Sequence, residues 1–493
     1  MRTNTRPIAT ILATLLSLCA LATVQAQFTF TTNNGTITIT KYTGPGGVVV
    51  IPSSTNGYPV TIIGSSAFSG CSTLTNVTIP NSITNIGTSA FGGCSHLPSL
   101  VIPDSVISIG DGAFYGAGLT NVTLGTNLVS IGFQAFASLS LPSVLIPASV
   151  TNLASYAFAW SLLTSATIYG GYGTNTFFFC ESLTNVMIGT NVTCIGPGMF
   201  YYCTRLPNVT IPDSVTNIGD TAFQSCSNLA NVVIGNGVTR IGTNAFLSCA
   251  SLLSVTIPNS VISMGYEAFE FCSSMTNLTL GNGLRSIDID AYWGCTSLLA
   301  VAIPSSVTNV GLGAFSECTR LTNIVIGDGV PSIGVQAFAY CTSLTNITIP
   351  SSVNSLGKAV FNGCANLQGA YFEGNAPSGG GSVLFNGDNN ATVYYIPGTL
   401  GWGPIFGGRP TAPWPLPYPV ILDNGPGFGL QTNGFGFPIA WNTNIPVVVE
   451  ACTNLANPIW CPVGTNTLTN GLSYFCDPQC TNNPASFYRV RSP

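Results

Sequence analysis

The chain holds few residues that could perform catalysis. Its single histidine, His96, falls in a variable turn between Cys94 and Leu97, where a lone exposed histidine is most often a plain surface residue. A covalent hydrolase needs a nucleophile, a base and a group that orients the base, and no such set stands out in the sequence. No phosphate-binding loop and no zinc-type spacing is present either. We therefore predict a protein without catalytic residues, enzymatic activity or cofactor.

A small acidic cluster is the candidate for metal or hydrolytic chemistry. Glu267 and Asp290 occupy the same position in adjacent copies of a repeated phrase, and Asp288 stands where most copies have glycine. Grouped carboxylate oxygens are suitable ligands for Ca²⁺, and a pair of carboxylates is also the catalytic arrangement of many glycoside hydrolases. A solvated acidic patch with neither role is the simpler interpretation. All three interpretations stay open at this point.

Aromatic side chains gather in one part of the chain and are candidates for ligand binding. Most lie one or two places after a recurring aromatic ring, where regular copies have residues such as Gln224 and Ser225. Flat apolar faces with polar tips suit a sugar ring or a protein hot spot. Alternatively, these side chains fill space left by a local deletion. The candidates are Trp160, Tyr169, Tyr172, Phe178, Phe179, Tyr201 and Tyr202.

Most of the 17 cysteines share one position, three residues after the recurring ring. If neighbouring copies stack about 4.8 Å apart, as parallel strands do, these cysteines are too far apart for the roughly 3.8 Å Cβ separation of a disulfide. We predict a buried ladder of free thiols, because free cysteine packs as a small hydrophobe. The eleven members are Cys71, Cys94, Cys180, Cys203, Cys226, Cys249, Cys272, Cys295, Cys318, Cys341 and Cys364.

Other cysteines have different surroundings. Cys194 falls at a position held elsewhere by Asn217, Arg240 and Ser263, which is consistent with an exposed free thiol or with chance. Four more lie in the last part of the chain, where one or two disulfides would offset a thin core. Four cysteines allow three pairings, and the sequence does not choose among them. These disulfide candidates are Cys452, Cys461, Cys476 and Cys480.

The elements that position these residues follow from an internal repeat. Its clearest copy runs from Ile218 to Arg240, and its aromatic ring recurs mostly every 23 residues. A fixed period of about 20 to 50 residues indicates a solenoid. In this copy Val232 and Ile234 share one face of a strand, and a spacing of three after Phe223 suits a tight helical or 3₁₀ turn. The fourteen ring residues are Phe68, Phe91, Phe114, Phe136, Phe158, Phe177, Phe200, Phe223, Phe246, Phe269, Tyr292, Phe315, Phe338 and Phe361.

The repeat resembles a known family. The phrase I-G-x-x-A-F-x-x-C-x-x-L-x-x-V-x-I-P, whose last part appears as Leu74, Val77, Ile79 and Pro80, is similar to the BspA-like class of bacterial leucine-rich repeats. The resemblance covers about residues 60 to 372. It implies a curved solenoid with a parallel β ladder and short turns, on an exported or surface protein whose usual role is adhesion or ligand binding. It implies no chemistry.

Composition outside the repeat indicates further domains. Two arginines before the apolar run Ile8 to Val24 are typical of a secretory signal and not of a membrane span. Asn34-Gly35 lies between alternating residues, as in a hairpin, and a proline-rich stretch suits a stiff linker. The predicted domains are a signal peptide (1–26), an N-terminal β cap (27–60), the solenoid (61–372), a divergent repeat with a C-terminal cap (373–409), a linker (410–419) and a small all-β module (420–493).

The composition limits the possible partners. Only 5% of residues are charged, and such a neutral polar surface argues against nucleic acid. After the signal, no stretch is long and apolar enough to span a membrane. We predict a secreted or cell-surface binding protein that recognises an extracellular protein or a glycan through its repeats. A structural rod of a matrix or envelope is the alternative, and an extracellular hydrolase is a third hypothesis. The ligand, the oligomeric state and the role of the C-terminal module do not follow from the sequence.

Overall fold

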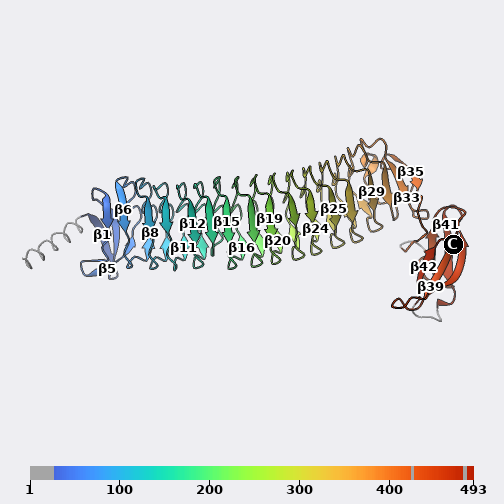
Figure 1. The fold of residues 1–493 in the computed structure, drawn as a ribbon, viewed down its shortest axis with the longest axis horizontal. Coiled ribbons are helices and arrows are strands. Elements are labelled where there is room, and N and C mark those ends of the chain that lie inside the picture. The colour runs from blue at the N-terminus through green and yellow to red at the C-terminus, as the bar shows by residue number, and fades with distance from the viewer. Residues whose placement is uncertain (1–26, 424–426, 481–485) are drawn as a thin grey trace, which may run out of the picture. The chain divides into compact units, whose positions relative to one another are not determined.

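The computed structural model describes residues 27–423, 427–480 and 486–493. These residues form a parallel β solenoid of about 16 turns and a small all-β module, which confirms the predicted fold class. The chain divides into two compact units, Met1–Met275 and Thr276–Pro493, here called the N-terminal and the C-terminal unit. Figure 1 shows the coils of each unit stacked one behind the other.

The N-terminal unit begins with a hairpin. β1 (Phe28–Asn33) and β2 (Thr36–Tyr42) are antiparallel. The two residues of the turn, Asn34 and Gly35, have positive φ angles of 49° and 75°, as tight hairpin turns of this kind require. On its other side β2 pairs in parallel with β5 (Tyr58–Ile63). The hairpin therefore covers the open edge of the first coils.

Each regular coil contains a long strand, a short strand and a turn. In the clearest coil, β17 (Asn208–Ile211) is followed by β18 (Asn217–Ile218) and by the turn that carries Phe223. The second and fourth residues of β17 are buried and the other two are exposed, because successive side chains of a strand point to opposite faces. β17 pairs in parallel and in register with β19 (Asn231–Ile234). The short strand, which the sequence analysis did not predict, forms a second ladder.

Most other coils of the N-terminal unit repeat this arrangement. Their strands are β3 (Gly47–Val50), β4 (Ser54–Thr55), β6 (Leu74–Thr78), β7 (Asn85–Ile86), β8 (Ser99–Val101), β9 (Ser108–Ile109), β10 (Asn121–Thr123), β11 (Ser130–Ile131), β12 (Ser143–Ile146), β13 (Asn152–Leu153), β14 (Ser165–Ile168), β15 (Asn185–Ile188), β16 (Cys194–Ile195), β20 (Arg240–Ile241), β21 (Ser254–Thr256) and β22 (Ser263–Met264).

The turns close through short-range backbone hydrogen bonds. The Cys226 N–H donates to the carbonyl of Phe223 at 3.2 Å, and the Leu229 N–H donates to that of Cys226 at 2.9 Å. Both bonds span three residues, as in a 3₁₀ turn. The Phe223 N–H also donates to the backbone carbonyl of Ala245 in the next coil at 2.8 Å. The predicted tight turns are present, and η1 (Gly381–Val383) is a 3₁₀ helix.

The core of the N-terminal unit is a column of stacked rings beside a column of thiols. Phe223 is fully buried and lies 5.1 Å from Phe200 and 5.2 Å from Phe246 between ring centroids. The Cys226 thiol donates to the carbonyl of Phe200 at 3.1 Å. Burial raises the pKa of Cys226 to about 12, so this thiol stays neutral at physiological pH.

The thiol ladder is as buried as predicted. Ten of the eleven members are buried free cysteines, and Cys71, in the first coil, is partly exposed. Where serine replaces cysteine, at Ser161, the hydroxyl makes the equivalent bond to the carbonyl of Phe136 at 3.1 Å. Where cysteine or serine is present, the ladder therefore satisfies a carbonyl of the preceding coil as well as filling space.

The C-terminal unit continues the same repeat. Its ring column runs on to Phe385, 5.3 Å from Phe361, so the divergent coil keeps the core pattern. The proline-rich stretch begins as β35 (Arg409–Pro413), which pairs in parallel with β33 (Thr392–Tyr395). The other strands of these coils are β23 (Asn277–Thr279), β24 (Ser286–Ile287), β25 (Ala300–Ile303), β26 (Asn309–Val310), β27 (Asn323–Ile326), β28 (Ser332–Ile333), β29 (Asn346–Ile349), β30 (Ser355–Leu356), β31 (Gly369–Phe372), β32 (Ser378–Gly379) and β34 (Ile405–Phe406).

The C-terminal module consists of two small antiparallel sheets. Three of its strands were predicted and are present as β39 (Pro446–Cys452), β41 (Leu472–Asp477) and β42 (Phe487–Arg491). Its core includes the fully buried Phe437 and Val449. Its further strands are β36 (Val420–Ile421), β37 (Gly429–Gln431), β38 (Gly434–Ala440) and β40 (Cys461–Thr467).

In the part of the chain that the structure describes, no helix has the length and apolar character needed to cross a bilayer. The predicted signal peptide, residues 1–26, lies outside the described residues.

Candidate functional site

Each turn contains two backbone positions with positive φ, two residues before and two residues after the buried ring. In the coil of Phe223 these positions hold Thr221, with φ of 56°, and Ser225, with φ of 60°. Left-handed backbone costs a residue with a Cβ about 1 to 2 kcal/mol, and glycine avoids most of that cost. Six coils have glycine at the second position, namely Gly70, Gly93, Gly116, Gly294, Gly363 and Gly387.

Several coils instead place bulky aromatic residues at these strained positions. Trp160, Phe179 and Tyr202 occupy the second position in three successive coils, with φ of 56°, 56° and 60°. Tyr156 occupies the first position, with φ of 60°. For a bulky residue a positive φ is an outlier, and such outliers gather at functional sites. The aromatic side chains are thus held at a backbone cost that glycine would have avoided.

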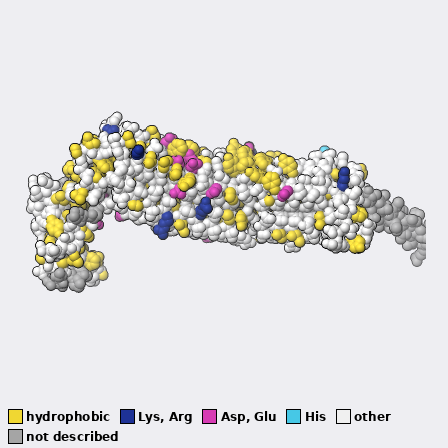
Figure 2. All heavy atoms as spheres, turned by 180° about the vertical axis from the view of Figure 1, so that it is seen from behind, with side chains coloured by type: hydrophobic (Ala, Val, Ile, Leu, Met, Phe, Trp, Pro, Cys, Tyr) yellow, Lys and Arg dark blue, Asp and Glu magenta, His cyan; other side chains and the backbone are white. Residues whose placement is uncertain are grey.

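These side chains form one connected surface, which we call the aromatic patch. It comprises Tyr156, Trp160, Phe178, Phe179, Tyr201 and Tyr202, and each ring lies within 6.4 Å of another between centroids. The side chain of Trp160 is 42% exposed and that of Tyr202 is 36% exposed. Figure 2 shows hydrophobic side chains gathered in a patch on the solenoid among mostly uncharged atoms.

Within the patch the rings stack in pairs, so that each covers one flat face of its partner. Tyr156 stacks on Trp160 with an angle of 2° between the rings, and Phe178 stacks on Tyr201 with an angle of 15°. Phe179 stacks on Tyr202 at 4.3 Å between centroids. Sugar rings bind to free aromatic faces, whereas apolar side chains of a protein also pack against ring edges. The stacking therefore leaves ring edges at the surface of the patch.

The structure brings five of the seven predicted aromatic residues together. Tyr169 and Tyr172 are exposed, but no ring contact joins them to the patch among the described residues. Sequence analysis missed Tyr156, and also Phe133, whose ring lies 5.9 Å from that of Tyr156. The sequence contained a signal for Tyr156, because Tyr156 lies two residues before the ring Phe158 and Trp160 lies two residues after it.

The shortened coil in this region lacks its short strand. β14 and β15 pair in register although only 20 residues separate Ser165 from Asn185, and no strand lies between them. Their coil keeps its buried ring, Phe177. The deletion therefore falls before the ring, while Phe178 and Phe179 come after it.

The acidic residues are placed by the same backbone positions. Glu267 and Asp290 have positive φ angles of 55° and 52°, two residues before their respective rings, and Asp288 directly follows β24. Glu267 lies in the N-terminal unit and the two aspartates lie in the C-terminal unit. In the described part of the chain, no group of three or more His, Cys, Asp or Glu side chains is arranged to hold a metal ion. The calcium hypothesis gains no support from this geometry.

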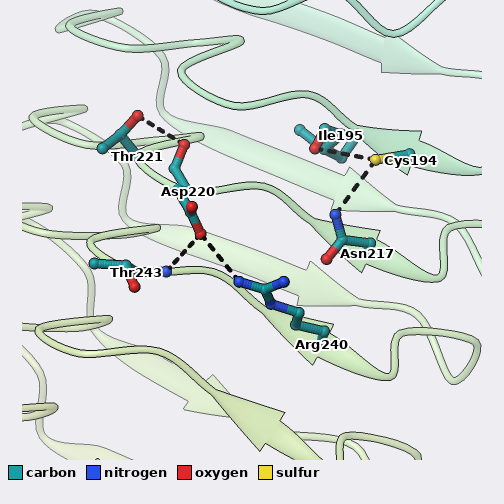
Figure 3. Close-up of polar contacts among 7 residues, drawn as sticks. All are labelled: Cys194, Ile195, Asn217, Asp220, Thr221, Arg240 and Thr243. Atoms are coloured by element: carbon teal, nitrogen blue, oxygen red, sulfur yellow. Dashed lines mark hydrogen bonds and ion pairs between the residues drawn. The ribbon is translucent and has the colours of Figure 1, made fainter.

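Cys194 is only partly exposed and lies in a polar row of short strands (Figure 3). Its thiol donates to the carbonyl of Ile195 and accepts from the Asn217 amide, both at 3.5 Å. In the same view, Arg240 forms an exposed ion pair of 3.5 Å with Asp220. The row is a local hydrogen-bond network.

His96 is exposed, and its Nδ1 lies 3.2 Å from the hydroxyl of Ser95.

The four cysteines of the module differ in their surroundings. Cys452 is buried and Cys461 is exposed. Ala451 lies directly opposite Cys461 in the β39–β40 pair, so the side chains of Cys452 and Cys461 point to opposite faces of the sheet. The Cys476 thiol donates to the backbone carbonyl of Asn433, and the Cys480 sulfur accepts from the backbone N–H of Phe435. Both backbone groups lie at the start of β38. The disulfide pairing itself stays a prediction.

Comparison with known proteins agrees with the repeat. The model of the BspA type leucine rich repeat region matches residues 50–165, 170–299 and 263–390, with six copies. A leucine-rich repeat protein of Bacteroides ovatus is 29% identical, with a TM-score of 0.57, over 75% of this chain and 93% of its own. A leucine rich cell surface protein of Faecalibacterium prausnitzii is 28% identical, with a TM-score of 0.38, over 71% of this chain and 94% of its own.

No curated protein matches the chain. The family match covers more than half of the 493 residues, and the predicted resemblance is confirmed. The chain belongs to the family of BspA-type leucine-rich repeat proteins.

Proposed function

We propose that this chain is a secreted or cell-surface protein without enzymatic activity, which binds an extracellular protein through its aromatic patch. The observation that carries the proposal is the placement of Trp160, Phe179 and Tyr202 at left-handed backbone positions. Other coils hold glycine, serine or glutamate at this position, and only two further coils, with Phe271 and Tyr340, have an aromatic residue there among the described residues. The aromatic residues are therefore not needed to build the coil, and a contact surface explains their presence.

The chemistry of the patch supports a protein partner. Aromatic residues carry a large share of the binding energy in protein interfaces, and a central one costs about 2 kcal/mol or more when truncated. Contiguous exposed apolar surface on a soluble protein commonly marks an interaction site. The exposed edges of stacked rings suit apolar side chains of a partner better than the face of a sugar. The family supports a binding role in general terms, and the partner is our proposal.

The test exploits the backbone geometry. In the double variant Phe179→Gly, Tyr202→Gly, both positions receive the residue that suits their φ, so stability should change by only about 1 kcal/mol. Tyr340→Gly is the matched control, because Tyr340 has φ of 57° and is 45% exposed at the equivalent position of another coil. Wild type and variants are screened on arrays of secreted proteins and of glycans.

We expect the wild type and Tyr340→Gly to bind the same secreted protein and the double variant to bind it more than roughly tenfold more weakly. Equal binding by a stably folded double variant would move the site elsewhere, for instance to the exposed Asn208 and Thr210 on the long strands. Binding to a glycan alone would contradict the protein partner. Concentration-dependent self-assembly of the wild type, lost in the double variant, would favour the structural rod instead.

A further inference from the structure

A cavity in the C-terminal unit is a second candidate binding site, independent of the proposed function. Its volume is about 360 Å³, within the range of about 300 to 1,000 Å³ that is usual for ligand pockets. One wall is a row at the ends of the long strands: Asp328 and Ser351 come two residues after β27 and β29, and Glu373 comes one residue after β31. Because successive long strands of a solenoid are parallel, these residues lie along one edge of the stack.

Most of the remaining lining comes from the segment that leaves the last coil. It contributes Trp414, Tyr418 and Asp423 to the lining. Trp414 is fixed in place, because its backbone N–H donates to the carbonyl of Tyr395 at 2.8 Å and its ring lies 5.0 Å from that of Tyr371. The side chain of Tyr418 is 66% exposed. The lining thus combines two aromatic side chains with polar residues at the strand ends.

The charges of the cavity are all of one sign. Its lining contains Asp328, Glu373 and Asp423 but no lysine or arginine. Within the described chain, the ion pairs use other acidic residues, Asp220 and Glu450. Burial, together with the nearby charge of Asp328, raises the pKa of Glu373, as expected where negative charge is not compensated.

The structure gives no support for a metal ion held by these carboxylates. None of the groups of acidic, cysteine or histidine side chains in the described chain is arranged to hold a metal. An organic cation is larger than a metal ion and could donate separate N–H groups to separate carboxylates. Each such contact would be a charge-assisted hydrogen bond. Its body could then lie against the aromatic side chains, which attract cations through their ring faces.

We propose that this cavity binds an organic cation, an ammonium or guanidinium group, with Glu373 and Asp328 as its hydrogen-bond acceptors and Trp414 and Tyr418 as its aromatic wall. Such a group is carried by a lysine or arginine side chain and also by an amino sugar. Both sources share the recognised chemistry, and the probes below separate them.

The experiment titrates the mature full-length chain with small probes, followed by calorimetry or NMR. The cationic probes are lysine amide, arginine amide and glucosamine. The α-amino group of both amino-acid cations is blocked. Their neutral counterparts are norleucine amide and citrulline amide with the same block, and the neutral counterpart of glucosamine is N-acetylglucosamine. We expect saturable binding of at least one cation and binding of its neutral counterpart that is weaker by roughly tenfold or more.

Two variants locate the site. Glu373→Gln keeps the side-chain size and should weaken binding of the cation by roughly tenfold, and Tyr418→Ala should also weaken it. Tyr418 is largely exposed, so its truncation is expected to leave the fold intact. Tyr418→Ala therefore still tests the site if Glu373→Gln fails to fold. Glu181→Gln removes an exposed carboxylate from the N-terminal unit and should change nothing.

Saturation by an amino-acid cation alone assigns the cavity to a protein side chain, and saturation by glucosamine alone assigns it to an amino sugar. The proposal is overturned if none of the three cations saturates the protein, if the neutral counterparts bind equally well, or if folded Tyr418→Ala and Glu373→Gln both keep the full affinity. None of these results bears on the aromatic patch, which lies in the N-terminal unit.

Discussion

Asp388 gives the sharpest stability prediction. It lies three residues after Phe385, at the position that Cys364 holds in the preceding coil, and its side chain is fully buried. Its carboxylate oxygens make no hydrogen bond of normal geometry, although the backbone of Cys364 lies near enough to favour the charged form. Burial raises the pKa of Asp388 from 3.8 to about 7, although the nearby charge of Arg409 lowers it. The thiol ladder therefore ends on a carboxyl group that is most stable when it is neutral.

The sign of the pH effect follows from proton binding. Between pH 4 and pH 7 the folded chain keeps the proton on Asp388 while the unfolded chain has lost it, so stability falls as the pH rises. A shift of about three pKa units corresponds to at most about 4 kcal/mol, since each unit is worth about 1.36 kcal/mol. The loss is complete above the folded pKa of about 7.

The perturbation is Asp388→Asn, which keeps the shape and removes the titration. Unfolding of wild type and variant is compared between pH 4 and pH 9, with the fluorescence of Trp402 and Trp414 as a reporter of the last coils. We expect similar stability near pH 4 and a growing advantage of the variant up to pH 8. Parallel profiles of the two proteins over the whole range would refute this assignment of the buried carboxyl.

Other predictions concern the core and the thiols. Phe223→Ala opens a cavity in the ring column and should cost about 3 to 5 kcal/mol in chemical denaturation, with partial unfolding because coils couple only to their neighbours; a loss below 1 kcal/mol would contradict the ring column. A thiol reagent should reach the buried Cys226 and Cys249 only on denaturation, so rapid labelling of either in the native protein would refute the ladder. Replacing exposed His96 by alanine should leave the melting temperature unchanged, and a large decrease would reveal an unrecognised structural role.

The repeat made much of the fold predictable. A period near 23 residues, with a ring and a cysteine three residues apart, requires that equivalent side chains stack, and the structure places Phe223 and Cys226 in such columns. Alternation alone predicted β39, β41 and β42 of the module. The short strands such as β18 were missed, because two residues are too few to show a periodicity.

The candidate site was predictable only in part. Aromatic residues after the ring were visible as departures from the repeat, and five of them meet. Their positive φ angles were not visible, since no residue type other than glycine marks left-handed backbone reliably. The cavity beside Glu373 was beyond sequence analysis, because Asp328 and Trp414 are 86 residues apart in the chain and only the stacking of coils brings both to its lining.

Hydroxyl-radical footprinting tests the central claim most directly. The purified mature chain is oxidised alone and with the partner protein found on the array, and the modification of each side chain is measured by mass spectrometry. The proposed interface predicts strong protection of Trp160, Phe179 and Tyr202 by the partner and unchanged modification of Tyr340, the equivalent residue outside the patch. Unchanged modification of the three patch residues, with protection elsewhere on the chain, would contradict it.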